Sequence, residues 1–457
     1  MLQTIILAAG QGTRMRSSLT KVLHPLAGTP MIRYPVNAAA ALGSTRIVVV
    51  VGHQGEKVCR EIDGIPGVTT VFQTEQKGTG HAVLCAQDAC ERGGTVLILC
   101  GDVPLIRSET LKNFLHHHHE SGATVTVMTT KVADPTGYGR IITREEGIIV
   151  RIVEEKDATP QEREITQVNT GIYSVDAPFL FDAVRNLGND NAQREYYLTD
   201  IVTIARQRGL PVRAHLVPDP EEVMGINDRE QLSHAGRVIR ERTNRRLMKE
   251  GVTIIDPAST HIHLSVEIGE DTVIHPGCTI TGTTRIGTGC VIEQNVVISD
   301  STIGDGCRIK ASSYIEGSSV GSRVTIGPMA HLRPDTILGD EVKIGNFVET
   351  KKIRMGNGSK ASHLTYLGDA EIGSDVNIGC GTITCNYDGT RKHQTVIGDR
   401  VFVGSDVQFV APVTVGDGSL IAAGTTVTKD VPPDSLAIAR SPQINKEGWT
   451  LRKREKN

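Results

Sequence analysis

Short apolar runs alternate with longer amphipathic segments over roughly the first 226 residues. The apolar runs have the length of strands, and the segments between them repeat their apolar residues at helical spacing. Apolar strands alternating with helices predict a mostly parallel α/β sheet with helices on both faces, and such sheets bind ligands beyond the carboxyl ends of their strands. The predicted strands are residues 4–10, 46–52, 95–102 and 123–132, and the predicted helices are residues 31–42, 80–90 and 109–120.

A different period begins at Val252. An aliphatic residue recurs every six positions, glycine often follows it, and a small or short residue often stands four positions after it. A period of six fits neither a helix nor a flat strand, and it predicts a parallel β-helix whose coils stack their aliphatic side chains. The longest unbroken series is Ile268, Ile274, Ile280, Ile286, Ile292 and Ile298.

This six-residue period is interrupted twice, between Thr350 and Leu367 and between Thr384 and Thr395. We expect both interruptions to loop out of the coil, and loops on a rigid scaffold are frequent positions for functional residues.

Residues 227–250 are strongly charged but carry Leu232, Val238, Ile239 and Leu247 near helical spacing, which predicts a linking helix. The predicted organisation is therefore an α/β domain over residues 1–226, a linking helix over residues 227–250, and a β-helix with a C-terminal tail over residues 251–457.

Composition narrows the classes of function. Basic and acidic residues nearly balance, 49 against 52, which argues against a nucleic-acid binder or a polybasic membrane-surface protein. No apolar run approaches the roughly 18 residues of a membrane span, and the N-terminus lacks the basic segment of a signal peptide. Nine cysteines without a C-x-x-C pair indicate reduced thiols in a cytoplasmic protein. Cys278, Cys290 and Cys307 fall in the small position of the six-residue repeat and are interpreted as packing residues.

A glycine-containing turn follows the first predicted strand in the segment LAAGQGTRM, residues 7–15. It has neither the spacing of a P-loop nor the third glycine of a dinucleotide fingerprint. Its bare backbone N–H groups, with Arg14 and Lys21 nearby, suit a triphosphate. The motif alone leaves phosphate binding and a plain strand turn equally open.

Three further groups have competing interpretations. Asp102 follows a strand and could be a helix cap or a metal ligand. Glu154 lies in a charge run that could be a solvated turn. The four histidines at residues 116–119 point in different directions on a helix, so we interpret them as a polar helix end and not as a metal site.

Many separate motifs occur in order along the chain: LAAGQGTRMRSSLTK at residue 7, GTGHA at 78, GDVPL at 101, DPTGYGRI at 134, VEEKDAT at 153, QVNTGIY at 167, HLTYLGDAEIG at 363 and TITCNYDG at 382. With them the chain resembles, over nearly all its length, the bacterial family of bifunctional N-acetylglucosamine-1-phosphate uridyltransferases and glucosamine-1-phosphate acetyltransferases. The resemblance implies a Rossmann-like nucleotidyltransferase domain, a linking helix and a left-handed β-helix of hexapeptide repeats. Two positions depart from the family pattern: Thr20 replaces a proline before Lys21, and Cys380 replaces a small alanine.

For the first domain, the resemblance implies uridylyl transfer from UTP to N-acetylglucosamine-1-phosphate with Mg²⁺. Asp102 and Asn227 would hold the metal ion, and Gly139, Glu154 and Asn169 would hold the sugar. The implied ligands of UTP and UDP-N-acetylglucosamine are Leu7, Ala8, Ala9, Gly10, Arg14, Lys21, Gln73, Gly78, Thr79, Cys100, Gly101, Asp102, Gly139, Glu154, Asn169 and Asn227.

For the β-helix, the resemblance implies acetyl transfer from acetyl-CoA to glucosamine-1-phosphate, with His363 as the general base. It also implies a cytoplasmic homotrimer with acetyl sites between subunits, small-molecule substrates, no nucleic-acid partner and no membrane span. Glucosamine-1-phosphate would meet Arg333, Lys351, Tyr366 and Asn377, and acetyl-CoA would meet Cys380, Asn386, Tyr387, Ser405, Ala423 and Arg440.

Two other functions remain alternatives. A nucleotidyltransferase could use its β-helix only for assembly or regulation, but His363 in its motif argues against this. A non-catalytic scaffold could keep both folds, but Arg14, Lys21, Asp102 and Asn227 argue against that.

Overall fold

The computed structural model describes residues 1–145 and 148–454, and it divides into two compact units, Met1–Ile239 and Arg240–Asn457. Each unit has its own hydrophobic core. The last three residues of the predicted C-terminal tail lie outside the described residues. No helix among the described residues is long and apolar enough to cross a bilayer.

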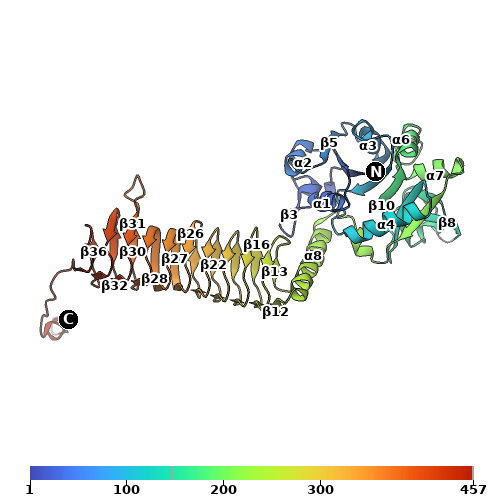
Figure 1. Ribbon diagram of the computed structural model, residues 1–457. Helices are drawn as coiled ribbons and strands as arrows, with labels where there is room; N and C mark the ends of the chain where they lie inside the picture. The colour runs from blue at the N-terminus through green and yellow to red at the C-terminus, as the bar shows by residue number, and fades with distance from the viewer. Residues whose placement is uncertain (146–147, 455–457) are drawn as a thin grey trace. The chain divides into compact units, whose positions relative to one another are not determined.

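The first unit is built on one mixed sheet of nine strands, counted over its described residues, with the main order β11-β7-β10-β6-β1-β4-β5. Figure 1 labels three of these strands, β5, β8 and β10. Strand β10 is antiparallel to both neighbours, the other main-path pairs are parallel, and a β8–β9 hairpin extends from β10. The mostly parallel sheet is thus confirmed. The strands are β1 Leu2–Ala8, β4 Arg46–Val51, β5 Val68–Phe72, β6 Thr95–Cys100, β7 Val125–Lys131, β8 Arg140–Glu145, β9 Ile148–Val153, β10 Gln167–Asp176 and β11 Val212–Leu216, with a separate pair β2 Pro25–Leu26 and β3 Thr29–Pro30.

Helices cover both faces of this sheet because its central strands are apolar on both sides. In β1, Ile5 packs in one core cluster and Ile6 in the other. The first cluster includes residues of α3, α6 and α7, and the second includes residues of α1, α2 and α4. The helices are α1 Arg33–Ala41, α2 Gly55–Ile62, α3 Thr79–Cys85, α4 Ser108–Glu120, α5 Pro160–Arg163, α6 Ala177–Arg185 and α7 Asp200–Gln207, with short 3-10 turns η1 Thr13–Met15, η2 Lys21–Leu23, η3 Gln87–Ala89 and η4 Pro220–Val223.

Helix α8 (Arg229–Lys249) is the last element to contribute to the first unit's core. Its Ala235, Val238 and Ile239 join a small apolar cluster in that unit, whereas Leu247 joins the core of the second unit. Helix α8 therefore contributes apolar side chains to both units.

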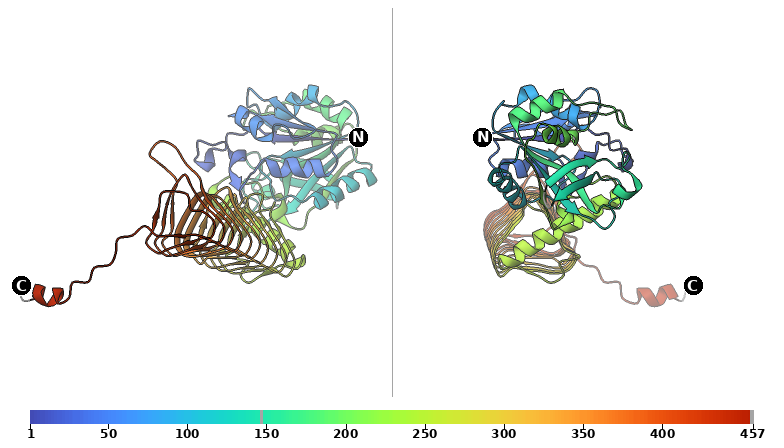
Figure 2. Two further views of the ribbon diagram at one scale, coloured as in Figure 1. Left: turned by 60° about the vertical axis from the view of Figure 1, so that its left-hand side comes forward. Right: turned by 90° about the vertical axis from the view of Figure 1, so that its right-hand side faces the viewer.

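The second unit is a parallel β-helix, in which most strands pair with the strand three further along the chain, so three short strands make one coil. The coils have the triangular cross-section visible in Figure 2. Its strands are β12 Thr253–Ile254, β13 His261–Ile262, β14 Glu267–Ile268, β15 Val273–Ile274, β16 Thr279–Thr281, β17 Arg285–Ile286, β18 Val291–Ile292, β19 Val297–Ser299, β20 Thr302–Ile303, β21 Arg308–Ile309, β22 Tyr314–Glu316, β23 Ser319–Val320, β24 Thr325–Ile326, β25 His331–Leu332, β26 Thr336–Leu338, β27 Lys343–Met355, β28 Lys360–Ile372, β29 Asn377–Ile378, β30 Ile383–Cys385, β31 Thr395–Ile397, β32 Phe402–Val403, β33 Gln408–Val410, β34 Val413–Val415, β35 Leu420–Ile421, β36 Thr426–Val427 and β37 Leu436–Ala437, followed by helix α9 Trp449–Arg454.

The six-residue period gives the inward ladder of this β-helix. Ile268 pairs with Ile286, and Ile286 pairs with Ile303, all three buried. The cysteines at 278, 290 and 307 are also buried and unpaired, which confirms their interpretation as packing residues.

The prediction that the chain loops out of the coil between Thr350 and Leu367 is wrong. Strands β27 and β28 run through this segment and pair with each other in register. Thr350 and Ala361 occupy inward positions where the pattern has an aliphatic residue, because they pair with Leu332 and Ile344. The Thr350 hydroxyl lies 2.9 Å from the hydroxyl of Thr336, so a buried threonine keeps a partner without breaking the coil.

The second interruption does leave the coil. The segment between β30 and β31 projects as a loop (Figure 1). Inside it Tyr387 and Lys392 form an isolated antiparallel bridge, and the His393 ring lies 2.7 Å from the Asp388 carboxylate. These contacts give the projecting loop its own internal structure.

The interpretation of residues 116–119 as a polar helix end is wrong for His118. This side chain is 2% exposed, and its Nδ1 lies 2.8 Å from the Thr126 hydroxyl on β7. Burial, followed by the neighbouring His119 and His117, lowers the pKa of His118 to about 4. The folded protein therefore holds a neutral imidazole at this position near pH 5.

Acidification from pH 7 to pH 5 is expected to destabilise the first unit by about 2 kcal/mol through His118. The unfolded imidazole takes up a proton near its ordinary pKa of 6.5, whereas the folded one stays neutral until about 4. Its contribution is therefore fully present above pH 6.5 and is lost as the pH falls towards 4. Urea unfolding followed by helical circular dichroism measures it, because most helices lie in this unit.

His118→Asn can keep the bond to Thr126 without the titrating ring, and it should reduce the loss of unfolding free energy between pH 7 and pH 5. His116→Asn, at an exposed position of the same helix, is the control and should leave that loss unchanged. A His118→Asn protein with the wild-type pH dependence would contradict the assignment.

Candidate active sites

A cavity of about 320 Å³ opens at the carboxyl ends of β1 and β6 in the first unit. This edge collects side chains because the β1 turn, the turn after β5 and the end of β6 all reach it. Many of the predicted nucleotide ligands line it together, namely Leu7, Ala8, Ala9, Gly10, Lys21, Gln73, Gly78, Thr79, Cys100 and Asp102.

Lys21 is the charged centre of this cavity. Its Nζ lies 2.5 Å from Asp102 Oδ2 and donates to Asn227 Oδ1 at 3.1 Å, although Asn227 is 206 positions away in sequence. Lys21 and Asp102 side chains are only 14% and 23% exposed. A carboxylate and an amide oxygen thus converge on one cation, which is the donor set that a hard divalent cation prefers.

Two features of the chain place Lys21 there. Gly12 has φ of 65°, and a Cβ at this position would lie 2.5 Å from the Lys21 Cβ, so the turn approaches Lys21 only because residue 12 is glycine. Thr20, which stands where the family has proline, has φ of −60°, the value that a proline ring imposes. The substitution therefore leaves the backbone path to Lys21 in a proline-like conformation.

The other predicted residues at this edge differ in position. Arg14 lies exposed in η1 and is not among the residues that line the cavity. Gly101 packs between strands, where a Cβ would lie 3.1 Å from Ala8. Burial, then the Asp102 carboxylate, raises the pKa of the Cys100 thiol to about 12, so this residue is a neutral thiol at pH 7.

The predicted uracil ligands lie in the turn between β5 and α3 and at the first residue of α3. Gln73 donates from Nε2 to the Gly78 carbonyl at 3.0 Å. Gly78 has φ of 102°, and a Cβ there would lie 2.7 Å from the Tyr196 carbonyl oxygen. Sequence reasoning missed Gln76, which donates to the Ala9 carbonyl at 2.8 Å, and Glu195, which also lines the cavity. No spacing signal in the sequence marks either residue.

Glu154 lies beside the two other predicted sugar ligands. A Cβ on Gly139 would be 3.5 Å from each Glu154 carboxylate oxygen, and the backbone N–H of Asn169 donates to the Gly139 carbonyl at 2.8 Å. Burial raises the pKa of Glu154, and the Thr199 hydroxyl donates to it at 3.3 Å. Glu154 is therefore not the freely solvated turn residue that the charge run allowed.

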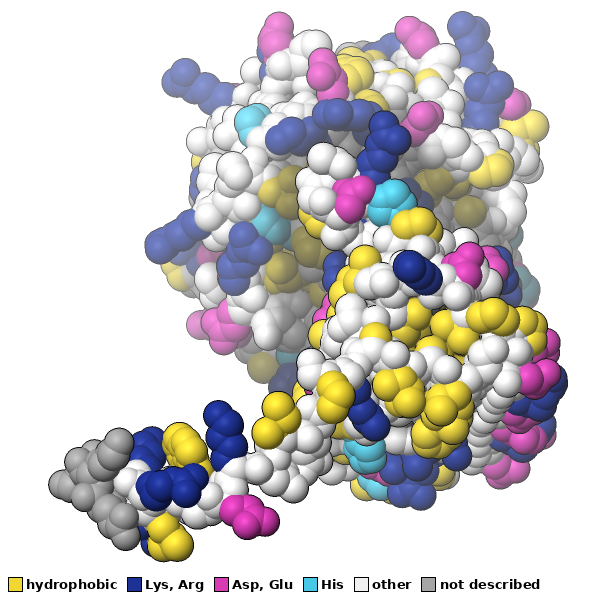
Figure 3. All heavy atoms as spheres, turned by 90° about the vertical axis from the view of Figure 1, so that its left-hand side faces the viewer, with side chains coloured by type: hydrophobic (Ala, Val, Ile, Leu, Met, Phe, Trp, Pro, Cys, Tyr) yellow, Lys and Arg dark blue, Asp and Glu magenta, His cyan; other side chains and the backbone are white. Residues whose placement is uncertain are grey.

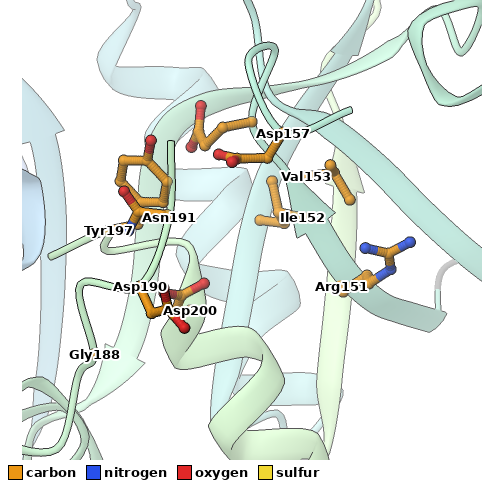
Figure 4. Close-up of a pocket in the computed structure, with 10 residues that line it drawn as sticks. Arg151, Ile152, Val153, Asp157, Gly188, Asp190, Asn191, Tyr197 and Asp200 are labelled. Carbon is orange, nitrogen blue, oxygen red and sulfur yellow. The ribbon is translucent and has the colours of Figure 1, made fainter. Parts of the chain in front are cut away.

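A second cavity of about 330 Å³ has Glu154 among its lining residues. Figure 4 labels nine of the others, including Asp157, Asp190 and Asp200. The cavity's side chains come from β9, the turn after it, the loop after α6 and the start of α7. Asp157, Asp190 and Asp200 make it acidic, and none of these three was predicted as a site residue.

In the β-helix, His363 lies on strand β28 and not in a loop, which corrects the expectation for this segment. Its partner in the preceding coil is Asn346, whose Oδ1 lies 2.9 Å from His363 Nδ1. Because Asn346 lies in the preceding coil, 17 positions earlier in the chain, the sequence pattern did not reveal it.

Residues predicted to meet acetyl-CoA follow His363 on successive coils. Backbone hydrogen bonds tie these coils at one corner: Gly381 N to Leu364 O at 2.9 Å, Asp406 N to Cys380 O at 2.7 Å, and Gly424 N to Ser405 O at 2.8 Å. The column at this corner is His363, Cys380, Ser405 and Ala423, and the Arg440 guanidinium donates to the Ala423 carbonyl.

The predicted glucosamine-1-phosphate ligands bring positive charges together. Arg333 and Lys351 are one coil apart, since Leu332 pairs with Thr350. The Lys392 ammonium, followed by the Arg333 guanidinium, lowers the pKa of Lys351. Lys392, in the projecting loop, was missed because only the fold brings it to this group.

The other predicted ligands of the β-helix lie on β28, on β29 or just after it, and in the projecting loop. Tyr366 lies on β28 three residues after His363, and Asn377 begins β29 three residues before Cys380. The Asn386 amide lies 2.5 Å from the Asp369 carboxylate, which fixes the start of the projecting loop, and the Tyr387 hydroxyl donates to Gly389 O at 2.6 Å. Cys380, the departure from the family, is exposed at its corner.

Comparisons with known proteins agree with this division. A family described as Nucleotidyl transferase matches residues 3–219, a GMPPB C-terminal domain family matches residues 262–358, and a bacterial transferase hexapeptide family of six repeats matches residues 394–429. The chain is 62% identical to the "Bifunctional protein GlmU" of Geobacter metallireducens over 99% of both chains. It is 61% identical to the protein of that name from Geobacter sulfurreducens and 49% identical to that from an Exiguobacterium species, each over at least 98% of both chains. The chain therefore belongs to the family of bifunctional GlmU proteins.

Proposed function

We propose that this bifunctional enzyme makes UDP-N-acetylglucosamine in two steps. The β-helix transfers acetyl from acetyl-CoA to glucosamine-1-phosphate, and the α/β unit then joins the product to UTP and releases pyrophosphate. The observation that carries the proposal is the contact of Lys21 with both Asp102 and Asn227 at the cavity of the first unit, in a chain whose second unit carries His363 and, one coil apart, the cations Arg333 and Lys351.

In the uridylyl step, a phosphate oxygen of the sugar phosphate attacks the α-phosphorus of UTP, and the bond to pyrophosphate breaks. The turn Leu7, Ala8, Ala9 and Gly10 lets its backbone approach the nucleotide, with Cys100 and Gly101 beside it. Lys21 and Arg14 neutralise charge that moves to the leaving group. Gln73, Gly78 and Thr79 read the uracil, and Gly139, Glu154 and Asn169 hold the sugar.

Magnesium is the metal that suits this site. Asp102 and Asn227 would hold it, because their oxygens already share the Lys21 ammonium and are hard donors. When bound, Mg²⁺ supplies neutralisation of the phosphate charges. Lys21 is then free to contact a phosphate group.

In the acetyl step, His363 accepts a proton from the amine of glucosamine-1-phosphate as the amine attacks the thioester carbonyl and the coenzyme A thiolate leaves. A hydrogen bond from Nδ1–H to Asn346 leaves Nε2 as the base. Arg333, Lys351 and Lys392 hold the phosphate, with Tyr366 and Asn377 beside the sugar.

The coil column beside His363 is the proposed acetyl-CoA groove. Cys380, Ser405 and Ala423 present backbone and small side chains along it, so the pantetheine arm can lie close to the corner. Asn386 and Tyr387 border the acyl end, and Arg440 meets the phosphates.

A homotrimer, with the acetyl site completed between subunits, fits the surface of the β-helix. Met329, Phe347 and Leu364 stack on three successive coils next to the His363 column, and they are 53%, 55% and 61% exposed. All three have positive φ, a conformation that bulky residues rarely adopt. Further apolar side chains are exposed on the end of this unit (Figure 3). The proposed substrates, UTP and acetyl-CoA, support a cytoplasmic location for the enzyme.

Leu364→Asp is expected to break the trimer and to lower acetyl transfer at least tenfold, because a charge in an apolar interface costs several kcal/mol. Uridylyl transfer should remain. Sedimentation measures the assembly, and separate assays measure the two activities. Ile444→Asp, at an exposed position of the tail, is the matched control. A trimer that survives Leu364→Asp would remove this column from the interface.

The proposed function is tested by supplying glucosamine-1-phosphate, acetyl-CoA and UTP with Mg²⁺ and omitting each in turn. All together should give UDP-N-acetylglucosamine and pyrophosphate, and omission of acetyl-CoA should be rescued by N-acetylglucosamine-1-phosphate. Absence of pyrophosphate in every mixture would favour a non-catalytic scaffold, and uridylylation without acetylation would favour a β-helix used only for assembly.

A further inference from the structure

Arg140 is the largest fully buried side chain among those described, with 1% of its surface exposed, and it begins strand β8 in the first unit. A guanidinium is almost never buried unless it is paired, since an unpaired buried charge is strongly unfavourable. The contacts of Arg140 therefore show which parts of the unit it holds.

Arg140 contacts three separate segments. Its Nη2 lies 2.7 Å from Glu155 Oε2, it donates to the Arg163 carbonyl at 3.3 and 3.4 Å, and it donates to the Tyr138 carbonyl. Glu155 Oε2 also accepts from the Gly137 amide at 3.2 Å. The pair thus joins the turn before β8, the turn after β9 and the end of α5.

The two joined turns carry the residues to which the proposed function assigns the sugar. Gly139 directly precedes Arg140, and Glu154 directly precedes Glu155. The Glu154 carboxylate stands close enough to Gly139 that a Cβ there would lie 3.5 Å from both of its oxygens. The neighbouring glutamates therefore differ. Glu155 is paired with Arg140, which lowers its pKa, whereas Glu154 lines the acidic cavity and accepts a hydrogen bond from the Thr199 hydroxyl.

We propose that Arg140 and Glu155 are positioning residues for the sugar-1-phosphate, because their pair fixes the separation of Gly139 from Glu154. The proposal rests on the proposed function, in which these two residues hold the sugar. Removing a group that orients a metal ligand typically lowers affinity or activity 10- to 100-fold, and we expect a loss of the same order for a group that orients a sugar ligand. Among the described residues, no hydrogen bond or ion pair of Arg140 or Glu155 reaches a residue that lines the nucleotide cavity.

The test is the KM of purified full-length enzyme for N-acetylglucosamine-1-phosphate and for UTP, each at saturation of the other substrate. Glu155→Ala is expected to raise the KM for the sugar phosphate about 10- to 100-fold while changing the KM for UTP less than about twofold. Glu155→Gln can still accept from Arg140 and should lie between Glu155→Ala and the wild type. Acetyl transfer should be unchanged in both.

Glu61→Ala is the matched control, because Glu61 pairs with Arg33 at 2.5 Å and its side chain is 28% exposed against 30% for Glu155. It should leave both KM values unchanged. Arg140→Met should reproduce the effect of Glu155→Ala, and if it fails to fold, the Glu155 series decides alone.

The Glu154→Ala variant distinguishes a failure of the proposed function from a failure of the positioning role of Arg140 and Glu155. If it leaves the sugar-phosphate KM unchanged, the assignment of the sugar to Glu154 in the proposed function is wrong. If it raises that KM but Glu155→Ala does not, the positioning role is overturned and the proposed function stands. Equal rises in both KM values for Glu155→Ala also overturn it, because a general loosening of the unit would affect UTP and sugar alike.

Discussion

Replacing His363 with alanine should lower acetyl transfer by about 10²- to 10⁴-fold, the range over which a positioned general base accelerates a reaction. The amine of glucosamine-1-phosphate must lose a proton as it attacks the thioester, and the His363 imidazole is the group proposed to take that proton. Uridylyl transfer should keep its wild-type rate, because its proposed residues lie in the other unit. Separate assays of coenzyme A release and pyrophosphate release measure the two effects.

The matched control is His275→Ala, a histidine of the same β-helix that is outside the proposed site. It should leave both activities intact. If His363→Ala abolished both activities, the loss would be one of folding, and circular dichroism would show it. If acetyl transfer stayed near the wild-type rate, another group would have to be the base.

Much of the fold could be predicted because its two units obey different and simple periods. The apolar strands of the first unit alternate with helices, and the inward side chains of the second recur every six residues. The prediction failed where inward positions hold Thr350 and Ala361, because a pattern of aliphatic residues does not register a threonine whose hydroxyl is satisfied inside the coil.

The candidate sites were predictable only where a motif marked them. Asn346, Lys392 and Gln76 carry no sequence signal, since each reaches its partner through register or loop geometry. The same holds for Arg140, which lies in a recognised motif but whose role comes from its burial and from the turn that supplies Glu155. The motifs therefore marked most of the proposed ligand contacts, whereas Lys392 and the residues that position these contacts are brought together only by the fold.

Replacing Asp102 with asparagine should lower uridylyl transfer by about 10³-fold, or about 4 kcal/mol of transition-state stabilisation, while acetyl transfer is unchanged. The change keeps the shape of the side chain but removes the negative charge from the oxygen that now pairs with Lys21 at 2.5 Å. A neutral amide holds a divalent cation much less tightly, so the variant should also need more Mg²⁺ for its remaining rate.

The Mg²⁺ dependence decides between the two roles that Asp102 could have. If Asp102 only held Lys21 in place, Asp102→Asn would lower the rate at every Mg²⁺ concentration by the same factor. If it also holds the metal, the midpoint of the Mg²⁺ titration should move to higher concentration, and the loss should shrink as Mg²⁺ rises. Asp182→Asn, which removes one charge from an exposed ion pair with Arg208 in the same unit, should change neither the rate nor the midpoint.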